Sequence, residues 1–291
     1  MTGRTLGALL ALTSAASFGV MPVLTKVVYD DGPGVYGVLS VRFTVGAALL
    51  LLLARLRSER LPQGRQLRDL VLLGGVGYVI ESLCYFSALS RISAGLTALL
   101  LYLYPALVVL LSAVLLRHRP SRTALGCVVV ATLGTALTIG PVAGGQMSGV
   151  LLGLGAAVAY ATYIVLSSQA ISGVGPFATS AVVMGSCAVV YDVLAVSTRA
   201  ELPHSAQAWA ALTGVTVLGT VVAVAAFFAA LPLLGPSDTA VLSTLEPVVS
   251  VAVAAVALGE RLSLVQVAGG ALVVAAVVVL ARLVPVPEPL P

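Results

Sequence analysis

The residues with the clearest chemical potential in this chain of 291 residues are ionisable groups inside long apolar stretches. Glu81 lies between Tyr78 and Tyr85 at spacings of three and four residues, so the three side chains share one face of a helix. A charge in the middle of a membrane helix costs about 2.5–3.5 kcal/mol on insertion scales, and such residues usually serve binding or proton transfer. We therefore expect Glu81 to face a cavity, where it holds a substrate amino group or takes a proton.

Three further ionisable residues lie in apolar surroundings. Glu246 precedes Pro247, whose missing N–H predicts a helix kink. We expect Glu246 to be mainly structural, as an acceptor for backbone donors near the kink, with substrate binding as the open alternative. Arg42 is expected either to snorkel or to pair with a carboxylate, in a structural or a functional role. Asp192 is expected close to the outer membrane face.

Polar and aromatic residues recur on one side of several predicted helices. Residues at spacings i, i+3, i+4 and i+7 share a helix face, and such faces should line an interior cavity. Tyrosines near helix ends are instead typical of the membrane interface, and we assign Tyr29, Tyr36 and Tyr191 to that belt. The predicted substrate-binding residues are Phe18, Met21, Tyr78, Glu81, Tyr85, Tyr104, Tyr160, Tyr163, Ser243 and Glu246.

The composition excludes a soluble globular protein. Hydrophobic residues make up 59% of the chain and charged residues only 9%, whereas soluble domains contain about 25% charged residues. Together with a mean hydropathy of +1.11, this predicts an all-α integral membrane protein. The three cysteines lack the spacing of a metal or disulfide site, and no metal or cofactor is expected. The ten apolar segments are residues 5–28, 35–54, 69–89, 93–116, 121–140, 148–168, 176–197, 207–231, 236–258 and 263–283.

The second half of the chain repeats the first with a shift of 142 residues. Between residues 84–121 and 226–263, 14 of 38 aligned pairs are identical, against roughly four expected by chance. Pro105 aligns with Pro247, and Tyr104 stands where the second half has Glu246. We interpret residues 1–142 and 143–284 as two five-helix repeats, followed by a Pro-rich tail at 285–291 that is expected to be disordered.

The basic residues predict the orientation in the membrane. With the N-terminus inside, ten of them fall on the inner side and four on the outer side, which predicts a multi-pass protein of the cytoplasmic (inner) membrane with both termini cytoplasmic. Five helices per repeat is an odd number, so the second repeat must be inverted, with a substrate site near the bilayer midplane between the repeats. The inner set is Arg4, Arg55, Arg57, Arg60, Arg65, Arg68, Arg117, Arg119, Arg122 and Arg282, and the outer set is Lys26, Arg91, Arg199 and Arg261.

The repeat, the LEPVV run at 245–249 and the LGERLS run at 258–263 resemble the drug/metabolite transporter superfamily, specifically its EamA-type exporters. The resemblance covers essentially the whole chain, although the first repeat has Arg-His-Arg at 117–119 in place of Gly-Glu-Arg. It implies ten helices around a central cavity lined by the first, third, fourth, sixth, eighth and ninth helices. It also implies transport, usually outward, of amino acids, related metabolites or drugs.

These features predict a secondary transporter that exports small metabolites by alternating access, with amino acids, aromatic ones included, as the expected substrates. No G-x-x-x-x-G-K-[ST] motif is present, so ATP is not expected to drive it directly. Protons are a candidate coupling ion, and one chain contains a full pathway, so a monomer would suffice. The expected partners are the substrate and the lipid bilayer, without nucleic acid.

Three alternatives to metabolite export are considered. A multidrug exporter of cationic drugs and a non-transporting membrane scaffold stay open. An intramembrane enzyme would need a catalytic cluster, whereas His118 and His204 fall in loops predicted on opposite sides of the membrane. Outside the core, Glu260 is expected to cap a helix or to pair at the membrane edge.

Overall fold

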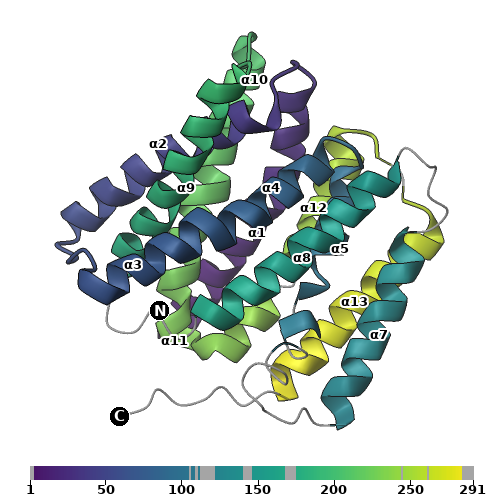
Figure 1. Ribbon diagram of the computed structural model, residues 1–291. Coiled ribbons are helices and arrows are strands. Elements are labelled where there is room, and N and C mark those ends of the chain that lie inside the picture. The colour runs from purple at the N-terminus through teal and green to yellow at the C-terminus, as the bar shows by residue number, and fades with distance from the viewer. Residues whose placement is uncertain are drawn as a thin grey trace.

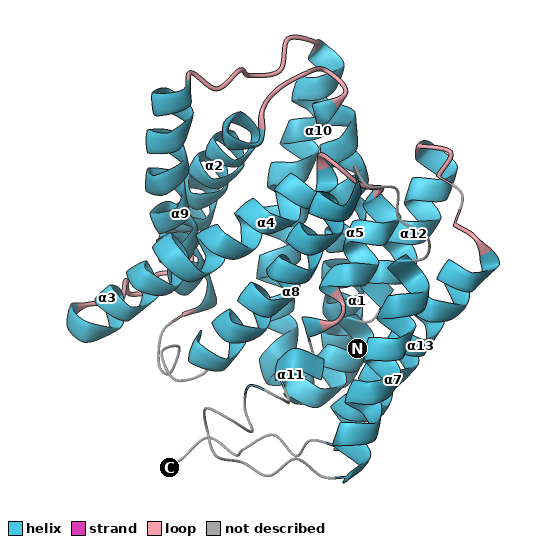
Figure 2. Ribbon diagram, turned by 45° about the vertical axis from the view of Figure 1, so that its right-hand side comes forward, coloured by secondary structure: helices cyan, strands magenta, loops and turns pink. Residues whose placement is uncertain are grey.

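The computed structural model describes residues 3–104, 106–108, 111, 122–139, 146–167, 175–243, 245–260 and 262–283. Every regular element in these ranges is a helix, as Figure 2 shows. The predicted tail at 285–291, Pro105 and residues 117–119 lie outside the described residues. The elements, in which η marks a π-helical stretch, are α1 (Gly3–Tyr29), α2 (Val35–Leu56), α3 (Gly64–Leu72), η1 (Leu73–Tyr78), α4 (Val79–Leu89), α5 (Ala94–Leu101), α7 (Arg122–Ile139), α8 (Met147–Ser167), α9 (Pro176–Thr198), α10 (Ala206–Thr216), η3 (Val217–Val222), α11 (Ala223–Ser243), α12 (Leu245–Ala257) and α13 (Leu264–Leu283).

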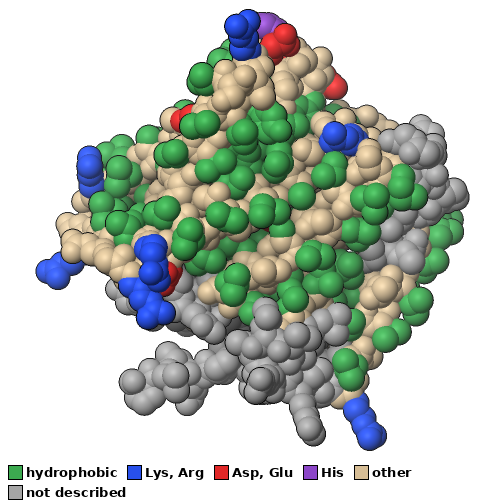
Figure 3. Space-filling model, in the orientation of Figure 1, with side chains coloured by type: hydrophobic (Ala, Val, Ile, Leu, Met, Phe, Trp, Pro, Cys, Tyr) green, Lys and Arg blue, Asp and Glu red, His purple; other side chains and the backbone are tan. Residues whose placement is uncertain are grey.

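The predicted all-α membrane fold is confirmed. Within the described residues, six helices are long and apolar enough to cross a membrane, and four shorter apolar helices occupy the positions of the other predicted spans. Large apolar side chains point outward, for example Val256, Leu264 and Val196, which are 89%, 88% and 79% exposed. Figure 3 shows one such face, with hydrophobic side chains across it and Lys and Arg side chains around its margins. This outward apolar surface is what a bilayer requires.

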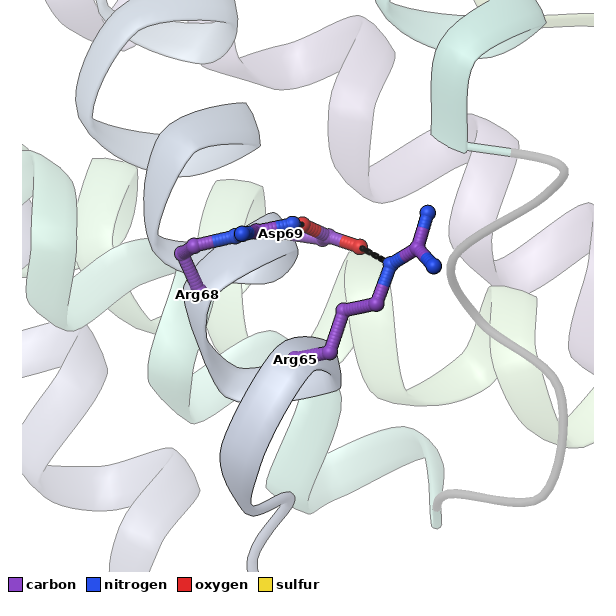
Figure 4. A network of polar contacts seen from close by, with 3 residues as sticks. All are labelled: Arg65, Arg68 and Asp69. Atoms are coloured by element: carbon purple, nitrogen blue, oxygen red, sulfur yellow. Dashed lines mark hydrogen bonds and ion pairs between the residues drawn. The ribbon is translucent and has the colours of Figure 1, made fainter.

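The connection between the second and third spans is shorter than the predicted one, which runs from residue 55 to residue 68 and contains five arginines. α2 continues to Leu56 and α3 begins at Gly64, because apolar runs mark the hydrocarbon boundary rather than the end of the helix. At this edge Asp69 contacts Arg68 at 2.9 Å and Arg65 at 3.6 Å (Figure 4). Both arginines are well exposed, so these pairs add little stability and instead hold an acidic residue at the membrane boundary.

The chain reverses direction between the eighth and ninth spans, but helix α11 continues through residues 232–235, where the sequence predicts a break. α11 is helical as far as Ser243, and α12 starts at Leu245. The residues that lie beside α1 show the reversal. From residue 223 to residue 234, α11 runs antiparallel to α1, toward its N-terminus, whereas α12 runs parallel to α1. The neighbouring pairs are Ser14 with Ala223, Gly7 with Leu234 and Gly19 with Val249.

Helix packing is symmetric between the two halves of the chain. α1 packs on α11 while α8, its counterpart at the 142-residue shift, packs on α4; α2 pairs with α9, and α7 with α13 (Figure 1). The Tyr29 hydroxyl bonds the Phe86 carbonyl, so α1 and α4 finish at the same end of the bundle. α8 begins at that end, where Gly149 lies against Ile92. The second half therefore runs opposite to the first, as predicted.

Two π-helical stretches, η1 and η3, occupy corresponding helices of the two halves. A π-helical turn shifts the backbone hydrogen-bond pattern and leaves carbonyl groups that need other donors. The Tyr191 hydroxyl lies 2.7 Å from the Val79 carbonyl oxygen, and Cys187 Sγ lies 3.2 Å from that of Gly74. Tyr191 is fully buried and stacks on Phe43 at 5.4 Å. The assignment of Tyr191 to the interfacial belt is therefore wrong, because its hydroxyl serves the backbone of a neighbouring helix.

Tyr29 ends α1 and is half-buried, and its hydroxyl lies 3.1 Å from the Phe86 carbonyl oxygen, so it also links two helices; its place in the interfacial belt stays a prediction. Asp192 accepts hydrogen bonds from the hydroxyls of Ser40 and Thr44 on α2. The carboxylate thus joins α9 to α2.

Candidate functional site

A cavity lies at the centre of the fold, between the two halves of the chain. It leaves about 60 Å³ for the centres of water-sized molecules, which is room for a few waters. Residues of both halves contribute, so neither half alone builds it. Its lining residues are Phe18, Met21, Arg42, Tyr78, Glu81, Tyr85, Phe86, Leu101, Tyr102, Tyr104, Tyr160 and Glu246.

Most of the predicted substrate-binding residues meet at this cavity. Tyr163 and Ser243 are not among its lining residues. The Tyr163 ring packs against two lining residues, with its centre 5.5 Å from that of the Tyr78 ring and 6.3 Å from that of the Tyr160 ring. The backbone carbonyl of Ser243 accepts the Tyr102 hydroxyl at 2.5 Å. The structure thus brings the predicted residues together, and substrate binding by them stays a prediction.

Arg42 is the cation of the cavity. It is only 2% exposed, and its Nε donates to Thr220 Oγ1 at 2.9 Å. Its guanidinium carbon lies 4.9 Å from the centre of the Phe43 ring and 4.8 Å from that of Phe86, both within cation–π range. Among the described residues no carboxylate lies within ion-pair distance of Arg42, so the predicted carboxylate pair is absent there. Arg42 does not snorkel either, since it faces the interior.

Glu81 is the more deeply buried carboxylate. It lies in the first turn of α4, directly after η1, and is 7% exposed. Within the described part of the chain, no side chain or backbone group makes a hydrogen bond or ion pair with its carboxylate. A buried carboxylate without a protein partner is costly, so it requires water, a proton or a ligand in the cavity.

Glu246 differs from Glu81 because it has a partner. Its Oε2 lies 3.1 Å from the Tyr102 hydroxyl, while the same hydroxyl lies 2.5 Å from the Ser243 carbonyl oxygen. Ser243 is four residues before Pro247, whose missing N–H leaves this carbonyl without its helical donor. Glu246 was expected to accept backbone donors, but its acceptor role is toward a tyrosine hydroxyl instead.

Aromatic rings form a continuous wall beside the two carboxylates. The Tyr104 and Tyr160 rings pack edge to face at 4.7 Å, and Tyr102 and Tyr104 do so at 5.8 Å. Edge-to-face packing is a favoured arrangement of aromatic rings. The wall therefore presents apolar and hydroxyl-bearing surface to whatever occupies the cavity.

Sequence reasoning missed Tyr102 and Phe86 as lining residues and left the role of Arg42 open. Helical periodicity does not give the facing of Tyr102, because α5 ends at Leu101 and Tyr102 lies in a turn. The helices implied as lining also differ. Among described residues, the eighth span contributes no lining residue and the second contributes Arg42. The eighth span acts through Thr220, which holds Arg42.

Outside the cavity, Glu260 confirms the expected capping role. Its carboxylate oxygens accept the backbone N–H groups of Ala94 at 2.8 Å and Gly95 at 3.1 Å. These groups start α5 and lack partners within their own helix. Glu260, in the second half of the chain, therefore stabilises a helix of the first.

Comparison with known families agrees with this architecture. The sequence profile of the EamA-like transporter family matches residues 5–140 and again residues 147–282. The chain belongs to this family. The double match shows that the EamA-like protein is duplicated, with one copy of the family unit in each half.

Individual relatives of this EamA-like protein share 30% sequence identity or less with it in the matches described here. The chain is 25% identical to an uncharacterized transporter, YcbK, of Bacillus subtilis over 276 residues, covering 90% of this chain and 88% of the relative. It is 30% identical to the pseudopaline exporter CntI of Pseudomonas aeruginosa over 135 residues, which is 46% of each chain. A solved crystal structure has the same fold, with a TM-score of 0.66 and 23% identity over 96% of this chain and 98% of that one.

Proposed function

We propose that this membrane transporter is a secondary exporter of small metabolites, with amino acids, aromatic ones included, as its substrates. The observation that carries the proposal is the central cavity, which holds Arg42, Glu81 and Glu246 inside a ring of aromatic side chains. A cavity between inverted repeats is where alternating access places a transport site. The excess of basic residues on the predicted inner side supports cytoplasmic termini in a cytoplasmic membrane.

The size of the cavity does not discriminate between amino acids and drugs, because room for a few waters is too small for either. Sites for drug-sized molecules enclose about 300–1,000 Å³, whereas this cavity leaves about 60 Å³ for water-sized centres. Two carboxylates and aromatic rings would also suit a cationic drug, which keeps multidrug export as the second candidate. The matched relative named as a pseudopaline exporter supports the outward direction.

Transport into proteoliposomes tests the proposal. Purified wild-type protein, Glu81→Gln and Glu201→Gln would be compared with a panel of labelled amino acids and one cationic dye, with and without a pH gradient. Glu201 is an exposed carboxylate in the loop before α10 and controls for the substitution itself. We expect wild type and Glu201→Gln to accumulate an amino acid when the gradient is imposed.

We expect Glu81→Gln to lose this accumulation and to exchange substrate across the membrane more weakly than wild type. Equal gradient-driven accumulation by Glu81→Gln would show that Glu81 does not couple transport. Movement of the dye alone would favour the multidrug alternative. Failure of every compound to move with well-folded protein would contradict transport of these classes.

A further inference from the structure

Among its described lining residues, the cavity contains the buried guanidinium group of Arg42 and the buried carboxyl group of Glu81. Arg42 is 2% exposed and Glu81 is 7% exposed, and both line the same space. No ion pair joins them, and within the described residues neither has another charged partner at contact distance. Opposite charges that are buried at one site but held apart are suited to a ligand that carries both charges itself.

We propose that the cavity selects zwitterions that carry both a carboxylate and an ammonium group, with Arg42 binding the carboxylate and Glu81 the ammonium. The inference rests on the proposed function and deepens it by naming the recognition groups of the substrate. It assigns Arg42 as a specificity-determining residue, whereas the aromatic wall contacts the remainder of the substrate.

The surroundings of Arg42 leave one edge of its guanidinium available. Nε is already used by Thr220, and the Phe43 and Phe86 rings lie within 5 Å of the guanidinium carbon. The terminal Nη atoms therefore remain as the donors that can reach a ligand. A guanidinium edge matches the two oxygens of a carboxylate, and the fixed side chain loses little entropy when it binds.

The two carboxylates are not equivalent as ammonium acceptors. Glu246 already accepts the Tyr102 hydroxyl, which also serves the Ser243 carbonyl at the kink. Glu81 has no such partner within the described residues and lies in the helical stripe with Tyr78 and Tyr85. The unpartnered carboxylate gains most from an ammonium ion, because its burial is otherwise uncompensated. Glu246 then contributes to the polarity of the site without being the first contact.

A binding measurement on purified protein tests this directly. Thermal stabilisation in detergent would be measured with each of the twenty amino acids, and the best of them would be compared with its amide and its N-acetyl derivative. The amide lacks the carboxylate charge and the N-acetyl derivative lacks the ammonium. We expect wild type to bind the free amino acid at least about tenfold more tightly than either derivative.

The variants should remove one discrimination each. Arg42→Gln should lose the preference over the amide and keep that over the N-acetyl derivative, whereas Glu81→Gln should do the reverse. Arg42→Lys keeps the positive charge but lacks the two-donor edge, so it should retain a weakened preference for the amino acid over its amide. This variant replaces Arg42→Gln in the test if Arg42→Gln does not fold. Wild-type binding of the amide or the N-acetyl derivative as tightly as the amino acid would overturn the proposal. So would absence of binding by all twenty amino acids.

This design separates the inference from the proposed function. Binding that follows the expected pattern without any transport in proteoliposomes would leave the recognition site standing and contradict the exporter. Transport of an amine or a cationic dye, with no binding of zwitterions, would leave the transporter standing and contradict the recognition site.

Discussion

The hydroxyl of Tyr102 lies 2.5 Å from the backbone oxygen of Ser243, the carbonyl that the missing N–H of Pro247 leaves without its helical donor. The two residues come from opposite halves of the chain. The same hydroxyl lies 3.1 Å from Glu246 Oε2. The kink of the ninth span and the position of its carboxylate are therefore fixed by a residue of the fourth span.

Replacing Tyr102 with Phe should destabilise the protein by about 1–2 kcal/mol, because it removes the hydroxyl that contacts both the Ser243 carbonyl and the Glu246 carboxylate. It should also weaken ligand binding, since Glu246 loses its partner. Thermal unfolding in detergent and ligand-induced stabilisation measure the two effects. Tyr36→Phe, the same chemical change at the start of α2, should alter stability by less than about 0.5 kcal/mol. Equal effects of the two substitutions would argue against the role given to the Tyr102 hydroxyl.

Replacing Thr220 with Val should weaken binding of the best amino acid about three- to tenfold. The change keeps the shape of the side chain but removes the oxygen that accepts Arg42 Nε at 2.9 Å, so the guanidinium loses its fixed position. The informative readout is the affinity ratio of the amino acid to its amide, which a general loss of stability would not change. Thr220→Ser keeps the oxygen and should restore the ratio. An unchanged ratio in Thr220→Val would exclude Thr220 as a positioning residue.

Replacing Gly19 with Ala should cost about 1–3 kcal/mol of stability through overpacking. An added Cβ would lie 2.7 Å from Val249 Cβ and 2.8 Å from the Glu246 backbone oxygen, where α1 packs against α12. Gly126→Ala in α7, which meets no described atom within 4 Å, is the matched control and should be neutral or stabilising. Thermal unfolding of both variants would decide. A Gly19 variant as stable as wild type would mean that α1 and α12 separate easily.

Asp31 should make the contact between two loops sensitive to acid. Its carboxylate accepts the backbone N–H groups of Ser205 and His204, and these hydrogen bonds lower the pKa of Asp31 below its ordinary value of 3.8. The charged form is thus the stabilising one. Its contribution is complete above pH 3.8 and is lost as the pH falls through the lowered pKa.

Thermal unfolding between pH 6 and pH 3 checks this linkage. Wild type should unfold at a higher temperature than Asp31→Asn near neutral pH, and the gap should close in acid. Asp30→Asn, at the neighbouring position, should follow wild type throughout. A gap between wild type and Asp31→Asn that stayed constant down to pH 3 would contradict the linkage.

The sequence by itself determined the class of protein, its helices and its duplication. Apolar runs of sufficient length leave the helix as the structure that satisfies its own backbone in lipid, and an odd number of spans per repeat requires inversion. Helical periodicity also selected Tyr78, Glu81 and Tyr85 correctly as neighbours on one inward face. These properties are local to one segment or follow from counting segments, so no contact between helices is needed to infer them.

Only the tertiary structure decided which groups meet. The pairing of Tyr102 with Ser243, the contact of the Tyr191 hydroxyl with the Val79 carbonyl and the direction of Arg42 toward Thr220 join residues 112 to 178 positions apart. A helix pattern gives the facing of a side chain within its own helix, but helix crossing, π-helical turns and the break after Leu101 change that facing relative to other helices. For that reason Arg42, Glu81 and Glu246 could be recognised from the sequence as candidates, whereas the groups that each of them contacts could not.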